Sequence, residues 1–338
     1  ATFDTLPESG WQIASPRQET LRSTLTLRAS TVQPIWITVR VPADAPAGNY
    51  DGAVTVRAEG QEPVAVRVRL LVADWSLPEP KKFTTYMGFV QSPDTLAIQY
   101  RVEPWSPKHW ELIGRSFELI GQVSGKALYI PLVAKTHFGN AHSMVRWIKS
   151  PDGGYSHDFS IVEKYVDTAL KHLGRIPVVC AYCWEPEKVG SHYDHNTFHG
   201  ERQILFSVLD PKSGQLSLAK GPKWGTPACR AFWKPVMAGL KKILKKRGLE
   251  RSMMLGLCND FEPSKGAADD LAAAAPEVPW VVHSHTGGWL SRGVRGRPVG
   301  YLACIWGMSG VSDPDVPYVW SKQRRFYGWK YPVLCRAI

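Results

Sequence analysis

The chain has 338 residues, of which 44% are hydrophobic and 21% are charged, an ordinary composition for a globular protein that argues against disorder. A chain of this length can bury a substantial core and has room for one large domain and one small one. No segment has the length of apolar sequence that a membrane-spanning helix needs, so we expect no membrane partner.

The positive charge lies almost entirely in the later part of the chain. The formal net charge is +11, and residues 1–76 hold seven Lys and Arg against eight Asp and Glu, so the remaining residues carry +12. Two stretches, Lys234–Arg251 and Arg292–Arg336, supply most of this surplus. The first interleaves lysines with leucine and isoleucine, as the solvated face of an amphipathic helix does. Since no recognised nucleic-acid-binding motif accompanies the charge, we expect no nucleic-acid partner.

The six cysteines are too few and too scattered to form a disulfide framework. Cys180 and Cys183 have the spacing of a redox motif, but they lie inside the apolar run Ile176–Trp184. A redox pair needs surroundings that stabilise the thiolate, such as a helix N-terminus, so we interpret these two residues as small core residues of a buried strand. The pattern leaves the redox compartment open.

The start of the chain bears on localisation. Its first residue is Ala1 rather than methionine, and the residues that follow are polar and do not form a signal sequence. This start fits a leader that has been removed, and we therefore expect a periplasmic or secreted protein.

Hydrophobic residues alternate with a period of two over the first part of the chain, which predicts strands with one solvated face. The alternation is clearest in Ile35–Val41 and Val64–Leu70, and the segment Pro42–Gly52 between them is rich in turn residues. Short strands with Gly and Pro turns predict a small β-sandwich over residues 1–76. Trp75–Pro80 then serves as a linker.

From residue 82 onward, apolar runs alternate with helical patterns. The runs predict parallel strands buried on both faces; they are Phe83–Val90, Ala127–Val133, Ile176–Trp184, Met253–Asn259, Trp280–His285, Val299–Trp306 and Pro332–Ile338. Helices are expected at residues 107–123, from Ser160 (in a predicted capping box with Glu163) to Gly174, and from Trp233 to Leu244. We therefore predict a multidomain β plus α/β protein whose residues 82–338 form a (β/α)8-type barrel, incomplete by one missing or unrecognised strand.

The segment 185–226 is too long for a simple connection, and we expect it to cover a site, with a hairpin at Ile204–Ala219. Its three histidines, His192, His195 and His199, have a spacing that matches no zinc pattern. We interpret His137 and His142, in the loop after the second predicted strand, in the same way. No metal and no other cofactor is expected.

In such a barrel, the carboxyl ends of the strands and the loops after them build the site. Acidic residues, histidines and tryptophans gather at these ends, and these residue types protonate glycosidic oxygens and stack on sugar rings. The candidates for substrate contact are Trp184, Glu185, His283, His285, Trp289, Tyr301, Trp306 and Trp329. The sequence therefore predicts a carbohydrate partner.

The segment Asn259–Pro263 carries the candidate catalytic residues, Asp260 and Glu262. Two carboxylates two residues apart on extended backbone project to one side, about 6–7 Å apart along the chain. That separation suits a cooperating acid pair, or a carboxylate that steadies another group. Alternatively, Glu262 belongs to the acidic start of a helix at residues 266–275. The sequence leaves both interpretations open.

Several segments resemble one family of enzymes. Pro34–Gly52 is similar to the accessory β-sandwich that precedes bacterial glycoside-hydrolase-like barrels. Leu249–Asp260, Trp280–His285 and Tyr327–Trp329 resemble relatives of glycoside hydrolase family 123. The resemblance implies a glycosidase that acts on a β-linked N-acetylhexosamine, as N-acetylgalactosamine is, with the acetamido oxygen of the substrate as the nucleophile and retention of configuration.

The family's pattern is an adjacent Asp-Glu pair followed by Pro, in which Asp orients the acetamido group and Glu is the general acid. Glu262-Pro263 matches the second half of this pattern, but Phe261 separates Glu262 from Asp260. An alternative register sets Asn259-Asp260 against the pair, which leaves the acid role to Asp260 or abolishes catalysis. A non-catalytic glycan-binding protein and a structural or assembly protein are the two other classes that the sequence leaves open.

Overall fold

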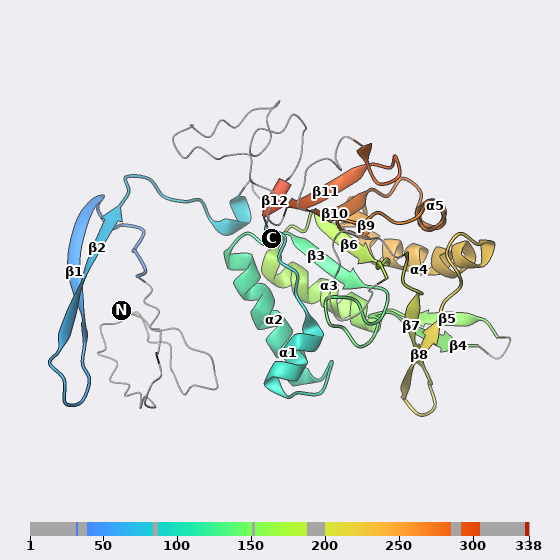
Figure 1. The fold of residues 1–338 in the computed structure, drawn as a ribbon, viewed down its shortest axis with the longest axis horizontal. Helices are drawn as coiled ribbons and strands as arrows, with labels where there is room; N and C mark the ends of the chain where they lie inside the picture. The colour runs from blue at the N-terminus through green and yellow to red at the C-terminus, as the bar shows by residue number, and fades with distance from the viewer. Residues whose placement is uncertain are drawn as a thin grey trace. The chain divides into compact units, whose positions relative to one another are not determined.

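The computed structural model describes residues 32, 39–83, 87–150, 153–187, 200–284, 292–304 and 335–337 (Figure 1). The chain divides into two compact units, Ala1–Pro78 and Glu79–Ile338.

In the first unit, the described residues form a two-stranded antiparallel sheet. Strand β1 (Gly48–Val56) pairs with β2 (Val64–Val72) in continuous register, and Asp51 makes a cross-strand ion pair with Arg67 at 3.0 Å. The antiparallel pairing agrees with the predicted β-structure, but β1 begins inside the stretch that we expected to be a connection. The other strands of the predicted β-sandwich fall mainly on residues 1–31 and 33–38, which lie outside the described residues.

The second unit is built around a parallel sheet whose strands follow one another in chain order. Its strands are β3 (Ala127–Pro131), β6 (Val178–Tyr182), β9 (Met253–Cys258), β10 (Trp280–Ser284), β11 (Val299–Cys304) and β12 (Cys335–Ala337). A parallel bridge between Met87 and Gly125 places the first predicted strand segment beside the start of β3. Sequential parallel order is the order of a (β/α) barrel. Among the described residues no pairing joins β12 to the Met87 segment, so closure of the predicted barrel is not observed.

The parallel strands bury both of their faces, as their apolar runs predict. One face packs against the helices, where Leu128, Val179 and Leu255 share a core with residues such as Phe117 and Trp233. The opposite face has a separate cluster whose members include Tyr129, Cys180, Tyr182, Val281 and Tyr301. We call the first the helix face and the second the inner face. Alternate residues of each strand therefore enter different environments.

Of the five α-helices in the described residues, four begin at a hydroxyl side chain. The helices are α1 (Pro93–Tyr100), α2 (Pro107–Gln122), α3 (Ser160–Leu173), α4 (Pro227–Lys245) and α5 (Lys265–Ala274), with short 3₁₀ turns at Pro80–Lys82 and Glu250–Ser252. The hydroxyl oxygens of Ser92, Ser106, Thr226 and Ser264 accept the N–H three residues later at the starts of α1, α2, α4 and α5. Since Ser264 caps α5, Glu262 lies outside this helix.

The predicted capping box at the start of α3 is wrong. The N-cap is Phe159, and Ser160 is already the first helical residue. Asp158, at the end of the preceding strand, accepts the backbone N–H of Ser160 at 2.8 Å and its hydroxyl at 3.1 Å. The carboxylate of Asp158 therefore accepts the first helical amide, in place of the reciprocal hydrogen bonds expected between Ser160 and Glu163.

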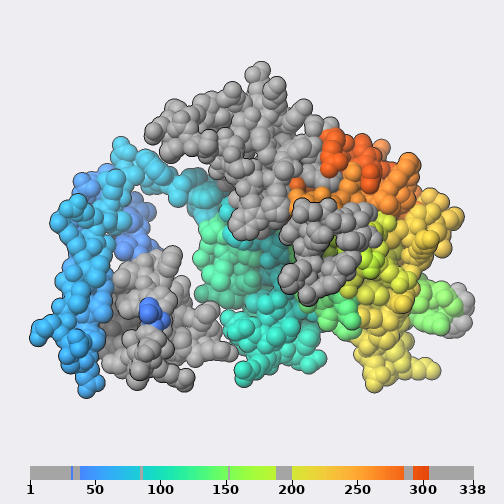
Figure 2. Space-filling model, viewed as in Figure 1, coloured from blue at the N-terminus to red at the C-terminus, as the bar shows by residue number. Residues whose placement is uncertain are grey.

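A second sheet lies in the longer connections of this unit. Its strand order is β5 (Tyr155–Asp158), β4 (Arg146–Lys149), β7 (Leu205–Leu209) and β8 (Leu216–Lys220). The β7–β8 hairpin was predicted, and its tip projects from the body of the second unit in Figures 1 and 2. Trp147 of β4 is fully buried and stacks on Phe232 of α4, with ring centroids 5.4 Å apart. The aromatic contact fixes this sheet against the helix.

Replacing Asp270 of α5 by alanine should destabilise the contact between α5 and α4. The side chain is fully buried, one of its oxygens accepts the N–H of Gly225 at 2.6 Å, and the other lies 3.5 Å from Arg230. The variant leaves that amide without its acceptor, so we expect a loss of about 1–3 kcal/mol in the free energy of unfolding, measured by denaturant titration.

Asp269→Ala is the matched control for this measurement. Asp269 is the neighbouring acid of the same helix and pairs with Lys265 and Arg297 at the surface. Because surface ion pairs contribute little to stability, its loss should be clearly smaller. Equal losses in the two variants would contradict the role assigned to Asp270.

Candidate functional site

Aromatic and histidine side chains meet on the inner face near the carboxyl ends of three strands. The hydroxyl of Tyr129 from β3 lies 2.9 Å from Nε2 of His283 from β10. Phe138, from the loop after β3, packs against Tyr129 and against Tyr182 of β6, with ring centroids 5.9 and 4.8 Å away. Tyr301 of β11 belongs to the same buried cluster. Strand alternation brings these rings together from segments far apart in the sequence.

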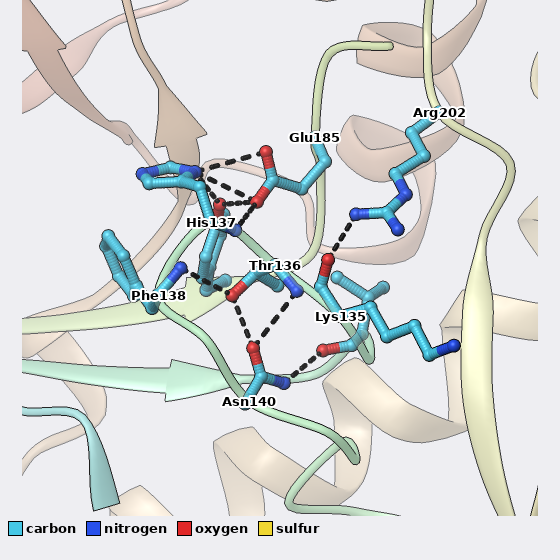
Figure 3. Close-up of polar contacts among 9 residues, drawn as sticks. Lys135, Thr136, His137, Phe138, Asn140, Glu185 and Arg202 are labelled. Carbon is cyan, nitrogen blue, oxygen red and sulfur yellow. Dashed lines mark hydrogen bonds and ion pairs between the residues drawn. The ribbon is translucent and has the colours of Figure 1, made fainter. Parts of the chain in front are cut away.

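Glu185 lies beside this cluster, three residues after β6, and is surrounded by donors. Its Oε1 accepts the backbone N–H of His137 at 2.6 Å, and Nδ1 of His137 lies 2.9 Å from Oε1 and 3.2 Å from Oε2. The hydroxyl of Tyr182 donates to Oε1 in a short hydrogen bond and also lies 2.9 Å from Nδ1 of His137. Figure 3 shows how His137 and Glu185 face each other. A carboxylate, an imidazole and a phenol thus form one hydrogen-bonded group.

The loop that carries His137 is held by Asn140. Both the amide and the hydroxyl of Thr136 donate to Oδ1 of Asn140 (Figure 3). Nδ2 of Asn140 donates to the carbonyls of Val133 and His142 at 2.9 and 2.8 Å. Lys135 adopts a left-handed φ of 56° at the start of this turn. Because Asn140 is buried, its four bonds form a local frame that fixes the backbone next to His137.

The surroundings of the site determine which groups carry charge. Burial, with a smaller contribution from the charge of His137, lowers the pKa of His283 to about 3. Burial raises the pKa of the Tyr129 hydroxyl well above its ordinary value. Burial would also raise the pKa of Glu185, but the hydrogen bonds and charge of His137 and the bond from Tyr182 outweigh it, so the pKa is lowered. At neutral pH, Tyr129 and His283 are uncharged and Glu185 is a carboxylate.

The candidate catalytic residues Asp260 and Glu262 lie at the end of β9 and have separate partners. Oδ1 of Asp260 accepts the hydroxyl of Ser284 at 2.8 Å. Oε1 of Glu262 accepts the N–H of Arg295 at 2.6 Å, and Oε2 lies 3.3 and 3.5 Å from the guanidinium groups of Arg295 and Arg292. The connection between β10 and β11 therefore binds Glu262, whereas the end of β10 binds Asp260.

The backbone between these two acids is not the extended segment that the sequence-based spacing assumed. Oδ1 of Asn259 accepts the N–H of Phe261 at 2.9 Å and closes a side-chain turn directly after β9. The bend at Asp260 and Phe261 changes the direction of the chain, so the 6–7 Å estimate for extended backbone does not apply. This local side-chain bond is the physical reason for the difference.

The other predicted contact residues fall into three groups. Glu185 and His283 belong to the inner-face site just described. Trp184 is 1% exposed and packs in the helix-face core, a position typical of packing rather than of a sugar platform. Tyr301 is buried on the inner face beside Gly88, where an added Cβ would lie 2.1 Å from the Tyr301 hydroxyl oxygen. His285, Trp289, Trp306 and Trp329 lie outside the described residues.

Sequence reasoning did not assign Tyr129, Tyr182 and Phe138 to the site, and it gave His137 no role. The signal for the two tyrosines is their parity: each occupies an inner-face position of its strand, Tyr129 in the middle of β3 and Tyr182 at the carboxyl end of β6. The contact between His137 and Glu185 joins residues 48 positions apart, so no local sequence pattern predicts it. The described residues contain no cluster of three or more potential metal ligands. They also contain no helix with the length and hydropathy to cross a membrane.

Comparison with known proteins gives two matches to family models. Residues 91–303 match the glycoside hydrolase 123 catalytic domain, and residues 11–58 match the glycoside hydrolase 123 N-terminal domain. No curated protein matches the chain.

Among solved structures, the chain resembles a family 123 glycoside hydrolase from Clostridium perfringens, whose structural analysis concerns glycolipid glycan hydrolysis. The TM-score is 0.57 at 15% sequence identity, and the match covers 78% of this chain and 45% of that one. At this identity the similarity supports the fold alone. The chain spans less than half the length of that enzyme.

The buried His283 should make stability depend on acid pH. Its folded-state pKa of about 3 lies below the ordinary value of 6.5, so between these values the unfolded chain binds a proton that the folded chain does not. Stability should therefore fall on acidification, by up to about 1.4 kcal/mol per pH unit from this residue. His283→Gln keeps an acceptor for Tyr129 without the titration. Urea titrations from neutral pH towards about pH 4 should give a shallower decline for the variant, and parallel curves would contradict this assignment.

Proposed function

The chain belongs to glycoside hydrolase family 123, and on this premise we propose that it hydrolyses a β-linked N-acetylhexosamine of the N-acetylgalactosamine type. The observation that carries the proposal is the turn after β9, which brings Asp260 and Glu262 to the carboxyl edge of the parallel sheet. The family match includes this turn and the three strands that supply Tyr129, Tyr182 and His283. Carboxylates at this edge are placed where folds of this kind carry their chemistry.

The proposed reaction uses the acetamido group of the substrate. Its oxygen attacks the anomeric carbon, the bond to the leaving oxygen breaks, and water then opens the cyclic intermediate with net retention. Asp260 would hold the acetamido N–H, with one of its oxygens steadied by Ser284 at 2.8 Å. Glu262 would supply the proton that the leaving oxygen takes up. Trp289 and Trp306, outside the described residues, stay predicted sugar platforms.

The contacts of Glu262 favour a second candidate function. Both of its oxygens face donors from the β10–β11 connection, and Phe261 separates it from Asp260. A general acid must release these donors before it can reach a leaving oxygen. A protein that keeps the contacts permanently would bind a glycan without cleaving it, and this non-catalytic binding protein is the alternative.

Chromogenic glycosides separate the two functions. We expect the full chain to cleave 4-nitrophenyl β-N-acetylgalactosaminide or its glucosaminide counterpart, and to leave the corresponding galactoside and glucoside intact. If the glycosides without an acetamido group are cleaved equally well, substrate assistance is wrong. If none of the four is cleaved but one of the sugars binds, the binding protein replaces the enzyme.

Variants of the two acids test their proposed roles. Asp260→Asn should lower kcat by about 10²–10⁴-fold, because the acetamido N–H loses its carboxylate. Glu262→Gln should impair an alkyl glycoside far more than the 4-nitrophenyl one, because the activated phenolate leaves without a proton. Asp269→Asn, at the surface of α5, is the matched control and should keep full activity. Equal losses on both leaving groups in Glu262→Gln would exclude Glu262 as the acid.

A further inference from the structure

The Glu185 carboxylate determines which nitrogen of the His137 imidazole carries the hydrogen. The side chain of Glu185 is 3% exposed, and its lowered pKa keeps it ionised at neutral pH. An ionised carboxylate has no proton to donate, so Nδ1 of His137, 2.9 Å from Oε1, must be the donor. When the imidazole is neutral, it therefore carries its hydrogen on Nδ1 and has a lone pair on Nε2. Among the described residues, Nε2 of His137 has no hydrogen-bond partner.

The free end of this imidazole lies at the inner-face site. The His137 side chain is 30% exposed, ten times the fraction of Glu185, so the accessible part of the pair is the imidazole. Its ring packs against Phe138 and Tyr182, at centroid distances of 4.6 and 5.8 Å. His283 lies close enough for the two histidines to interact electrostatically, but its own Nε2 is bonded to Tyr129. His137 thus combines exposure, a fixed tautomer and aromatic neighbours.

The backbone around His137 is ordered before any ligand arrives. The His137 amide donates to Glu185, and the Asn140 frame holds the adjacent Thr136. A side chain that is fixed in advance loses little conformational freedom when it binds a ligand. The arrangement is that of a carboxylate that orients a histidine, in which the far nitrogen acts on the ligand.

We propose that Nε2 of His137 accepts a hydrogen bond from a hydroxyl group of the bound sugar, and that Glu185 and Tyr182 are the positioning residues that hold it for this contact. The inference rests on the proposed function for its ligand class, a sugar hydroxyl. It assigns recognition to the loop after β3, whereas cleavage is assigned to the turn after β9. The same contacts could simply anchor the loop, and the experiment must separate anchoring from ligand contact.

Two substitutions of His137 each keep a polar group at the position of one ring nitrogen and remove the other. In His137→Asn the side-chain amide reaches the position of Nδ1, so the bond to Glu185 survives and the ligand end is lost. In His137→Gln the amide reaches the position of Nε2, so the ligand end survives and the bond to Glu185 is lost. If His137 contacts the sugar, His137→Asn should weaken binding roughly tenfold while stability stays near that of the wild type. If His137 only anchors the loop, His137→Asn should bind normally.

Histidine at position 142 provides the control. His142 lies on the same loop and is partly exposed, but its Nδ1 lies 3.0 Å from Ser207 of β7, away from the inner-face group. His142→Asn should leave sugar affinity unchanged. Glu185→Gln should weaken binding and reduce the population of the Nδ1–H tautomer of His137, a spectroscopic change that loss of packing alone would not cause.

The binding measurement uses N-acetylgalactosamine, N-acetylglucosamine, galactose and glucose as probes, with calorimetry for affinity and ¹⁵N-imidazole NMR for His137. Spectra are recorded at mildly alkaline pH, where an ordinary imidazole is neutral. We expect the Nδ1–H tautomer in the free wild-type protein and a shift of the Nε2 resonance when a probe binds. A protein that binds none of the probes, binds one without shifting Nε2, or keeps its affinity in His137→Asn overturns the inference. This measurement does not require hydrolysis. A protein that cleaves no glycoside but still shows the Nε2 shift on binding a probe would contradict the enzyme proposal and support the His137 contact.

Discussion

Two-sided burial of the parallel sheet is the constraint on which the other features of the second unit depend. Strands β3, β6, β9 and β10 bury all of their side chains, on the helix face or on the inner face. A polar group in such a strand must find a partner across the sheet, as Tyr129 and His283 do, or stand beyond the strand end. Chemistry is thereby confined to the carboxyl edge and to the few polar positions of the inner face.

The fold follows from the sequence wherever burial imposes a regular period. The apolar runs locate the parallel strands, and the amphipathic stripes locate α2, α3 and α4. Helix α1 and strands β4 and β5 escape this reasoning because they are too short to show a regular hydrophobic period. In β4, the packing of Trp147 on Phe232 is a tertiary contact that residue spacing does not predict. At the start of α3, the Ser160 amide donates to Asp158, and residue spacing alone does not predict this acceptor.

The site is less predictable than the fold, for two different reasons. Strand-end reasoning names Glu185 as a candidate because it closely follows a buried strand, but its hydrogen-bond partner His137 is brought to it by tertiary structure. At the end of β9 the failure is local. Extended geometry is the natural extrapolation from a strand, and a single side-chain bond from Asn259 to the amide of Phe261 replaces it with a turn. The catalytic roles of Asp260 and Glu262 stay predictions, and the extended backbone expected between them is wrong.

Two carboxylates near the strand ends have different hydrogen-bond donors, and on the proposed roles this contrast separates binding from cleavage. Glu185 is held by a histidine, a tyrosine and a backbone amide, and the proposed ligand contact through the far nitrogen of His137 leaves these three bonds in place. Glu262 is held by the amide and guanidinium groups of the β10–β11 connection. If Glu262 is the general acid, as proposed, proton transfer requires it to part from Arg292 and Arg295, whereas the proposed recognition through His137 requires no rearrangement. On the proposed assignments, affinity depends on the loop after β3 and turnover depends on the contacts of Glu262 with Arg292 and Arg295, which belong to a different segment of the chain.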